Sequence, residues 1–161
     1  DGAGSSRNGA FAGSMRQVRG GVVRELTSRK APVGEAAIAA RLGLPPDRVA
    51  EAAAALARDG LVEVTPSGRL LYVGNRGHNS IAGFTVDRVT GRLTPAGHAP
   101  TEAVPTAFGL DSGGSFLFSA GTASGRLASY RVNGETGALT PLGTYTAGQR
   151  PAAVLAVPLG G

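Results

Sequence analysis

The sequence predicts a two-part α+β chain, in which a helical module precedes an all-β antiparallel region. Three observations support this prediction. Apolar residues recur at helical spacing up to about residue 65. After that point, short alternating segments are separated by turns rich in Gly, Pro, Asn and Asp. The second region also repeats itself, because a shift of 46 residues places Leu71 to Thr94 on Leu117 to Thr140 without a gap.

The N-terminal part begins with residues 1 to 14, DGAGSSRNGAFAGS, a Gly- and Ser-rich stretch that predicts a disordered leader. A first helix is expected from Met15 to Lys30, where Gly20 and Gly21 each weaken it by about 1 kcal/mol relative to Ala. A second helix is expected from Glu35 to Leu42 and a third from Asp47 to Arg58.

The second and third helices, AAIAARLGLPPDRVAEAAAAL, resemble the helix-turn-helix of winged-helix proteins. Residues 61–64 and 70–73 would supply the wing hairpin, and the sequence leaves open whether 70–73 belong to the wing or to the first blade. The winged-helix-like module is expected to span residues 15–68. The resemblance implies a DNA-binding regulator, with Arg48 and Arg58 on the reading face. Asp47 and Glu51 on the same helix would repel phosphates, so a packing module without a DNA role is the alternative.

The all-β region, residues 69–161, is predicted to form two blades of an incomplete β-propeller. Each 46-residue repeat gives a strand, a polar turn, a second strand, a Thr-Gly turn and a Leu-Thr-Pro tail. Pro105 to Leu110 adds a strand, and Pro151 to Val157 repeats it. The patch Asn75-Arg76-Gly77-His78 does not repeat, since its counterpart is Gly-Thr-Ala-Ser at residues 121–124. A polar cluster that departs from a repeating scaffold is a candidate for function.

The segments NRGHNSI, TGRLTP, SGRLASYRV and TGALTP, in this order and spacing, resemble the last two blades of the lactonase-family seven-bladed β-propellers. That family includes the propeller type of 6-phosphogluconolactonase. The resemblance implies hydrolysis of a sugar lactone in a central cleft, without a metal or an organic cofactor.

The resemblance also implies roles for three residues, all in connections between predicted strands. Arg76 would hold an oxyanion or a phosphate, His78 would act as a general base, and Glu102 is a further catalytic candidate. The alternative interpretation is that these are solvated turn residues without a catalytic role.

Two blades cannot close a ring, so we expect the chain alone to be a weak or inactive lactonase, or to form a homo-oligomer through its open strand edges. The competing interpretations are a DNA-binding regulator whose blades serve dimerisation or sensing, and a rearranged gene product without a selected function. A small-molecule lactone is the expected ligand of the first interpretation and nucleic acid of the second.

Composition excludes several classes of protein. The sequence contains no Cys, which rules out disulfides and thiolate metal sites. No apolar run reaches the roughly 20 residues that a membrane span requires, so no membrane partner is expected and a cytoplasmic location is predicted. The net charge of +5 is divided as +2 over residues 1–66 and +3 over residues 67–161, so neither part is strongly basic.

Overall fold

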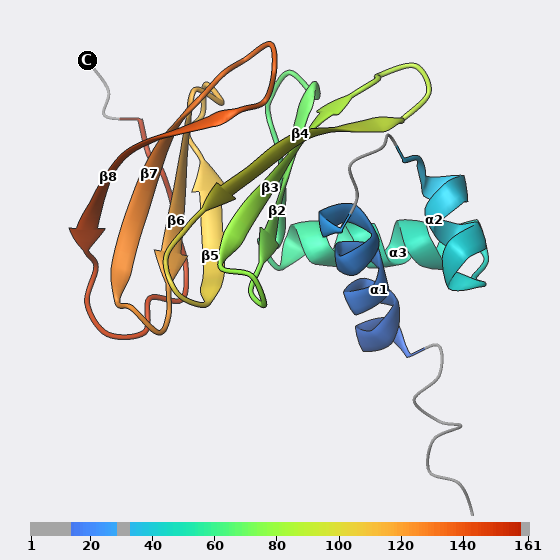
Figure 1. Ribbon diagram of the computed structural model, residues 1–161, viewed down its shortest axis with the longest axis horizontal. Helices are drawn as coiled ribbons and strands as arrows, with labels where there is room; N and C mark the ends of the chain where they lie inside the picture. The colour runs from blue at the N-terminus through green and yellow to red at the C-terminus, as the bar shows by residue number, and fades with distance from the viewer. Residues whose placement is uncertain (1–13, 29–32, 159–161) are drawn as a thin grey trace, which may run out of the picture.

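The computed structural model describes residues 14–28 and 33–158. Within these residues the chain forms three helices followed by two four-stranded antiparallel sheets, and the sheets do not close into a barrel (Figure 1). The predicted α+β chain with blades of an incomplete propeller is therefore confirmed. The predicted leader lies outside the described residues except for Ser14.

Each of the three helices has, at one end, a residue type that suits that position. Helix α1 (Met15–Thr27) follows Ser14, whose hydroxyl accepts the backbone N–H of Gln17 at 3.4 Å. Helix α2 (Glu35–Leu42) ends at Gly43, which has a left-handed φ of 63°. Helix α3 (Pro46–Arg58) carries Pro at its start. The predicted continuation of α1 to Lys30 lies partly outside the described residues.

The first sheet has the order β1 (Val62–Val64), β2 (Leu70–Asn75), β3 (Ser80–Val86), β4 (Leu93–Pro100). Strands β1 and β2 form the hairpin that was expected as a wing. Strand β2 also pairs with β3 along its whole length, so this hairpin is half of a four-stranded sheet. Strand β4 runs well beyond the predicted Leu-Thr-Pro tail because it pairs with all of β3.

The second sheet repeats the first with β5 (Pro105–Leu110), β6 (Phe116–Gly121), β7 (Arg126–Val132) and β8 (Leu139–Thr146). The repeat extends to single hydrogen bonds. Asp87 Oδ1 accepts the backbone N–H groups of the residues two and three further on, and Asn133 Oδ1 does the same in the second sheet. The predicted strand at residues 151–157 is not formed; this segment has no strand pairing in the structure.

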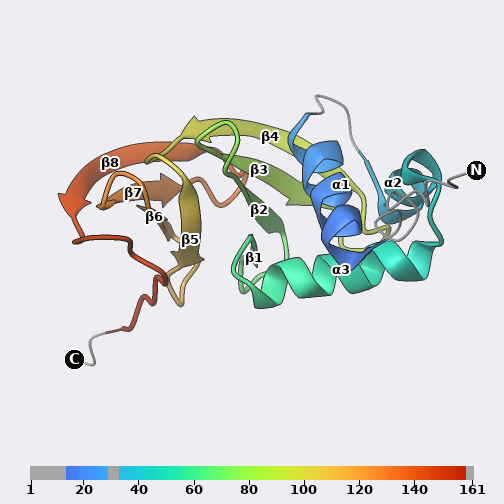
Figure 2. The ribbon, with the colours of Figure 1, turned by 90° about the horizontal axis from the view of Figure 1, so that it is seen from below.

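The first sheet lies between the helices on one side and the second sheet on the other, as Figure 2 shows. Strands β2 and β3 are mostly buried, whereas β4 is largely exposed. Leu71 and Val73 of β2 point toward the helices, where Val18, Val22 and Leu56 complete one core. Their neighbours on β2 point the other way, because side chains alternate along a strand. They join a second core between the two sheets, which contains Leu70, Tyr72, Ile81, Ala99, Phe108, Leu117, Ala128, Tyr130 and Val132.

Candidate functional site

The turn between β2 and β3 and the connection between β4 and β5 lie together at one end of the sheets, the lower end in Figure 1. Backbone hydrogen bonds join them. The Thr101 N–H donates to the Asn79 carbonyl at 2.8 Å, and the Val104 N–H donates to Asn79 Oδ1 at 2.9 Å. Arg76 and His78 are in the turn and Glu102 is in the connection, so all three predicted site residues belong to this end.

The backbone at this end is held in conformations that side chains rarely adopt. Asn79, Val104 and Arg150 have φ values of 49°, 55° and 53°. Asn tolerates the left-handed region, but a β-branched Val there is strained, typically by about 1–3 kcal/mol. Val104 and Arg150 are 46 residues apart and follow β4 and β8, so both sheets end in the same strained connection.

Arg76 lines a cavity of about 630 Å³ between α1 and the end of β2. The floor is apolar, with Val23, Leu56 and Leu61, and Arg16 and Arg19 contribute further guanidinium groups. Arg19 is paired with Asp59. In the described part of the chain, neither Arg16 nor Arg76 has an ion-pair partner. This cavity can therefore receive an anion.

His78 lines a different cavity of about 640 Å³, together with His98 of β4 and the C-terminal end of α1. Its Nδ1 lies 3.1 Å from the Ser80 hydroxyl, and its ring is 6.4 Å from that of His98, edge to face. His98 Nε2 lies 2.9 Å from the Thr27 carbonyl, so its N–H donates a hydrogen bond to that oxygen. In the tautomer with the proton on Nδ1, His78 Nε2 is left as a base facing solvent.

Glu102 faces the second sheet. Its Oε1 lies 3.5 Å from Arg126 Nε, and its side chain is only 16% exposed. It packs on Gly121, where an added Cβ would lie 2.6 Å from the Cβ of Glu102. It lines a third cavity with Tyr130 and Ser129. The structure thus brings Arg76, His78 and Glu102 to one end of the sheets but into three separate cavities.

Sequence reasoning missed several of the groups around these residues. Arg16 and Arg19 of α1 line the cavity of Arg76, and their three-residue spacing marks one side of the helix. Burial raises the pKa of Glu63, which lies in β1 opposite Tyr72 and away from the turns. A carboxyl with a raised pKa is a candidate acid, but no sequence motif marks Glu63.

The DNA-binding candidates lie on α3, whose Leu56 lines the same cavity as Arg76. Arg48 is bonded to Glu51 at 3.2 Å, which reduces the positive charge that it would offer to a phosphate. Arg58 is exposed, and the acidic Asp59 follows it directly. DNA binding through Arg48 and Arg58 stays a prediction.

Residues 14–28 and 33–158 contain no group of three or more His, Asp or Glu side chains placed to hold a metal ion. Among the same residues, no helix has the length and hydropathy to span a membrane.

Stacked four-stranded antiparallel sheets, each joined to the next at the same end, define blades of the β-propeller class. The chain belongs to the seven-bladed β-propeller lactonase family, whose model matches residues 43–156. Helices α1 and α2 precede the matched region.

Curated relatives agree with this assignment. The 6-phosphogluconolactonase of Pectobacterium carotovorum is 40% identical over 90 residues, which cover 56% of this chain and 27% of that protein. The enzyme of the same name from Pectobacterium atrosepticum is 39% identical over 98 residues, covering 60% and 30%. The chain thus spans less than a third of the length of these relatives.

Solved structures give the same picture. A Bacteroides fragilis protein, provisionally assigned as a 6-phosphogluconolactonase, superposes with a TM-score of 0.56 at 27% identity, over 58% of this chain and 27% of that one. The periplasmic gluconolactonase of Pseudomonas aeruginosa gives a TM-score of 0.53 at 27% identity, over 56% and 26%. Because that relative is periplasmic, a cytoplasmic location for this chain stays a prediction.

Proposed function

We propose that the chain supplies two blades of a lactone hydrolase that acts on a phosphorylated sugar lactone such as 6-phosphogluconolactone. The observation that carries the proposal is the position of Arg76 and His78. Both are exposed on the one turn that breaks the repeat, next to the connection that carries Glu102. The names of the Pectobacterium relatives, at about 40% identity across both blades, support the substrate class.

The chemistry needs a base for water and a cation for developing negative charge. His78 Nε2 takes a proton from water as the oxygen adds to the lactone carbonyl carbon. Arg76 stabilises the carbonyl oxyanion or holds the substrate phosphate. The ring C–O bond then breaks, and the ring oxygen takes the proton from His78 to give the open-chain hydroxy acid. Glu102, already paired with Arg126, orders the neighbouring connection and is the weaker catalytic candidate.

Three separate cavities predict a slow enzyme when this chain acts alone. Rate enhancement depends on holding the base and the cation around one reacting carbonyl, and here they line different cavities. Additional blades, from a second copy or another chain, would supply the remaining walls of a central cleft. The homo-oligomer predicted from open strand edges would act in this way.

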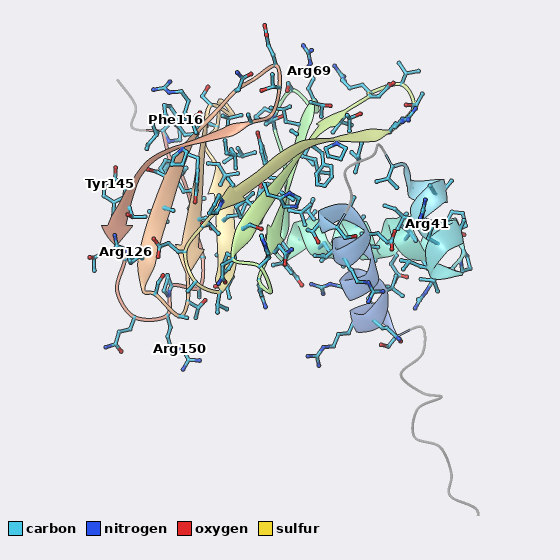
Figure 3. All side chains as sticks on the ribbon, in the orientation of Figure 1. Arg41, Arg69, Phe116, Arg126, Tyr145 and Arg150 are labelled. Atoms are coloured by element: carbon cyan, nitrogen blue, oxygen red, sulfur yellow. The ribbon has the colours of Figure 1, made fainter. Side chains whose placement is uncertain are left out.

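The test measures acid release from 6-phosphogluconolactone at constant pH, with spontaneous hydrolysis subtracted, for the full chain and its variants. We expect a slow rate above buffer that falls at least about tenfold in Arg76→Ala and in His78→Ala. Arg41→Ala is the matched control, because Arg41 lies on α2 far from the turns (Figure 3). No rate above buffer, together with no calorimetric binding of 6-phosphogluconate, would refute the proposal.

A further inference from the structure

Gly20 of α1 has no packing reason to be glycine. A Cβ added there would meet nothing within 4 Å, whereas a Cβ on the adjacent Gly21 would meet the Leu42 side chain at 3.1 Å. Gly21 therefore allows α1 and α2 to approach closely. Gly20 destabilises the helix by about 1 kcal/mol relative to Ala without any such gain. A residue that lowers helix stability without improving packing is expected to be there for a functional reason.

The consequence of a bare Gly20 is an open cavity. Gly20 lines the space of about 630 Å³ between α1 and the end of β2, within the range of small-molecule sites. Met15, Val23 and Leu61 face this space and are only half-buried, so apolar surface remains for a ligand to cover. Burial of such surface is worth about 25 cal/mol per Å².

The polar part of the cavity is cationic. Arg16 comes from α1 and Arg76 from the β2–β3 turn, and the ion pair of Arg19 with Asp59 leaves these two guanidinium groups for a ligand. None of the residues that line the cavity is acidic. Guanidinium groups bind carboxylates and phosphates through paired N–H donors.

We propose that this cavity binds a small amphiphilic anion, with its apolar body between α1 and β2 and its carboxylate or phosphate against Arg16 and Arg76. Four of the residues that carry the site belong to α1, which precedes the family match. The site is therefore a property of this chain's helices, and it requires neither lactone hydrolysis nor further blades.

The test is calorimetric titration of the full chain with decanoate and with decyl phosphate, each compared with decanol and with inorganic phosphate. Both amphiphilic anions are expected to bind, and the tighter one identifies the head group. Decanol and inorganic phosphate are each expected to bind at least about tenfold more weakly, since decanol lacks the anionic head group and inorganic phosphate lacks the apolar chain. Equal binding of decanol or of inorganic phosphate, or no binding of either amphiphile, would overturn the proposal.

Variants separate the cavity from general charge effects. Arg16→Ala and Arg76→Ala are each expected to weaken binding of the tighter amphiphile about tenfold, and Arg41→Ala to leave it unchanged. Gly20→Leu should block the cavity while raising the melting temperature, because it replaces Gly with a good helix former. Gly20→Ala is its control, with the helix gain and a much smaller side chain. If Gly20→Leu binds as tightly as Gly20→Ala, the ligand lies elsewhere and the proposal is wrong.

Discussion

The Tyr72 hydroxyl forms a hydrogen bond between the first sheet and the turn of the second, and removing this hydroxyl tests how much the bond stabilises the pair of blades. Tyr72 lies in β2 and is fully buried. Its hydroxyl donates to the Gly137 carbonyl, in the turn between β7 and β8, at 3.0 Å. Tyr72→Phe keeps the ring in the core between the sheets but removes the donor, and it leaves a buried carbonyl without its partner.

The expected loss is roughly 1–2 kcal/mol of unfolding free energy, from the missing hydrogen bond and the unsatisfied acceptor. With a urea m-value of about 2 kcal/mol/M, the unfolding midpoint should fall by about 0.5–1 M. Tyr145→Phe is the matched control, because Tyr145 is 57% exposed and loses the same hydroxyl at the surface (Figure 3). We expect Tyr145→Phe to change the free energy of unfolding by no more than about 0.5 kcal/mol, the usual range for surface substitutions.

Alkaline pH gives an independent readout. Burial raises the pKa of Tyr72 from 10.0 to about 12. Above pH 10 the unfolded chain releases this proton while the folded protein retains it, so stability falls as pH rises from 10 toward 12. At pH 12 this difference corresponds to roughly 2 kcal/mol of lost stability.

Tyr72→Phe should remove that part of the alkaline loss. The pKa of Tyr130 is also raised by burial, but Tyr130 is present in both proteins and cancels in the comparison. If Tyr72→Phe and Tyr145→Phe unfold at the same urea concentration, and wild type and Tyr72→Phe lose stability equally above pH 10, the hydroxyl does not join the sheets as described.

Three other substitutions follow from the comparison of the two repeats. Hydrogen bonds from the backbone N–H groups of Thr90 and Val89 lower the pKa of Asp87, so the stability that Asp87 contributes is lost as pH falls through that lowered pKa. Asp87→Asn introduces the residue found at the equivalent position, Asn133. It should leave the urea midpoint at neutral pH unchanged and reduce the decline of the midpoint in acid. Ser119→Ala should raise the free energy of unfolding by about 1 kcal/mol, because the buried Ser119 hydroxyl has no hydrogen-bond partner among the described residues. An unchanged or lower urea midpoint would contradict this. Gly121→Ala should lower the melting temperature by the equivalent of about 1–3 kcal/mol, since its Cβ would overlap Glu102; wild-type stability would show that the connection moves freely.

Much of the fold could be predicted because local signals repeat. Period-2 alternation and Thr-Gly turns predicted two paired strands in each repeat, which are β2 with β3 and β6 with β7, and the predicted second helix, Glu35 to Leu42, matches α2. The length of β4 could not be predicted, because its residues LTPAGHAP have little strand propensity and are held by pairing with β3. Residues 151–157 repeat a strand pattern and lie against β5, where Thr106 donates to the Pro151 carbonyl, but they are not paired as a strand.

The candidate site was harder to predict because its neighbours come from tertiary packing. The turn residues Arg76 and His78 could be found from the break in the repeat. Their cavities could not, since Arg16 and Thr27 approach them from a helix some 50 residues away in the chain. No periodicity in the sequence states which strand end a helix will cover.

The helices also change the chemistry of the turn that they cover. In the second sheet, Gly121 at the start of the turn packs against Glu102, which pairs with Arg126. The same 46-residue shift places Asn75 at the position of Gly121 and the apolar Leu56 of α3 at that of Glu102. Leu56 and Asn75 line one cavity together, and none of the residues that line it is acidic. Arg76 therefore faces apolar surface and other arginines instead of an acid, which leaves its charge for an anionic ligand.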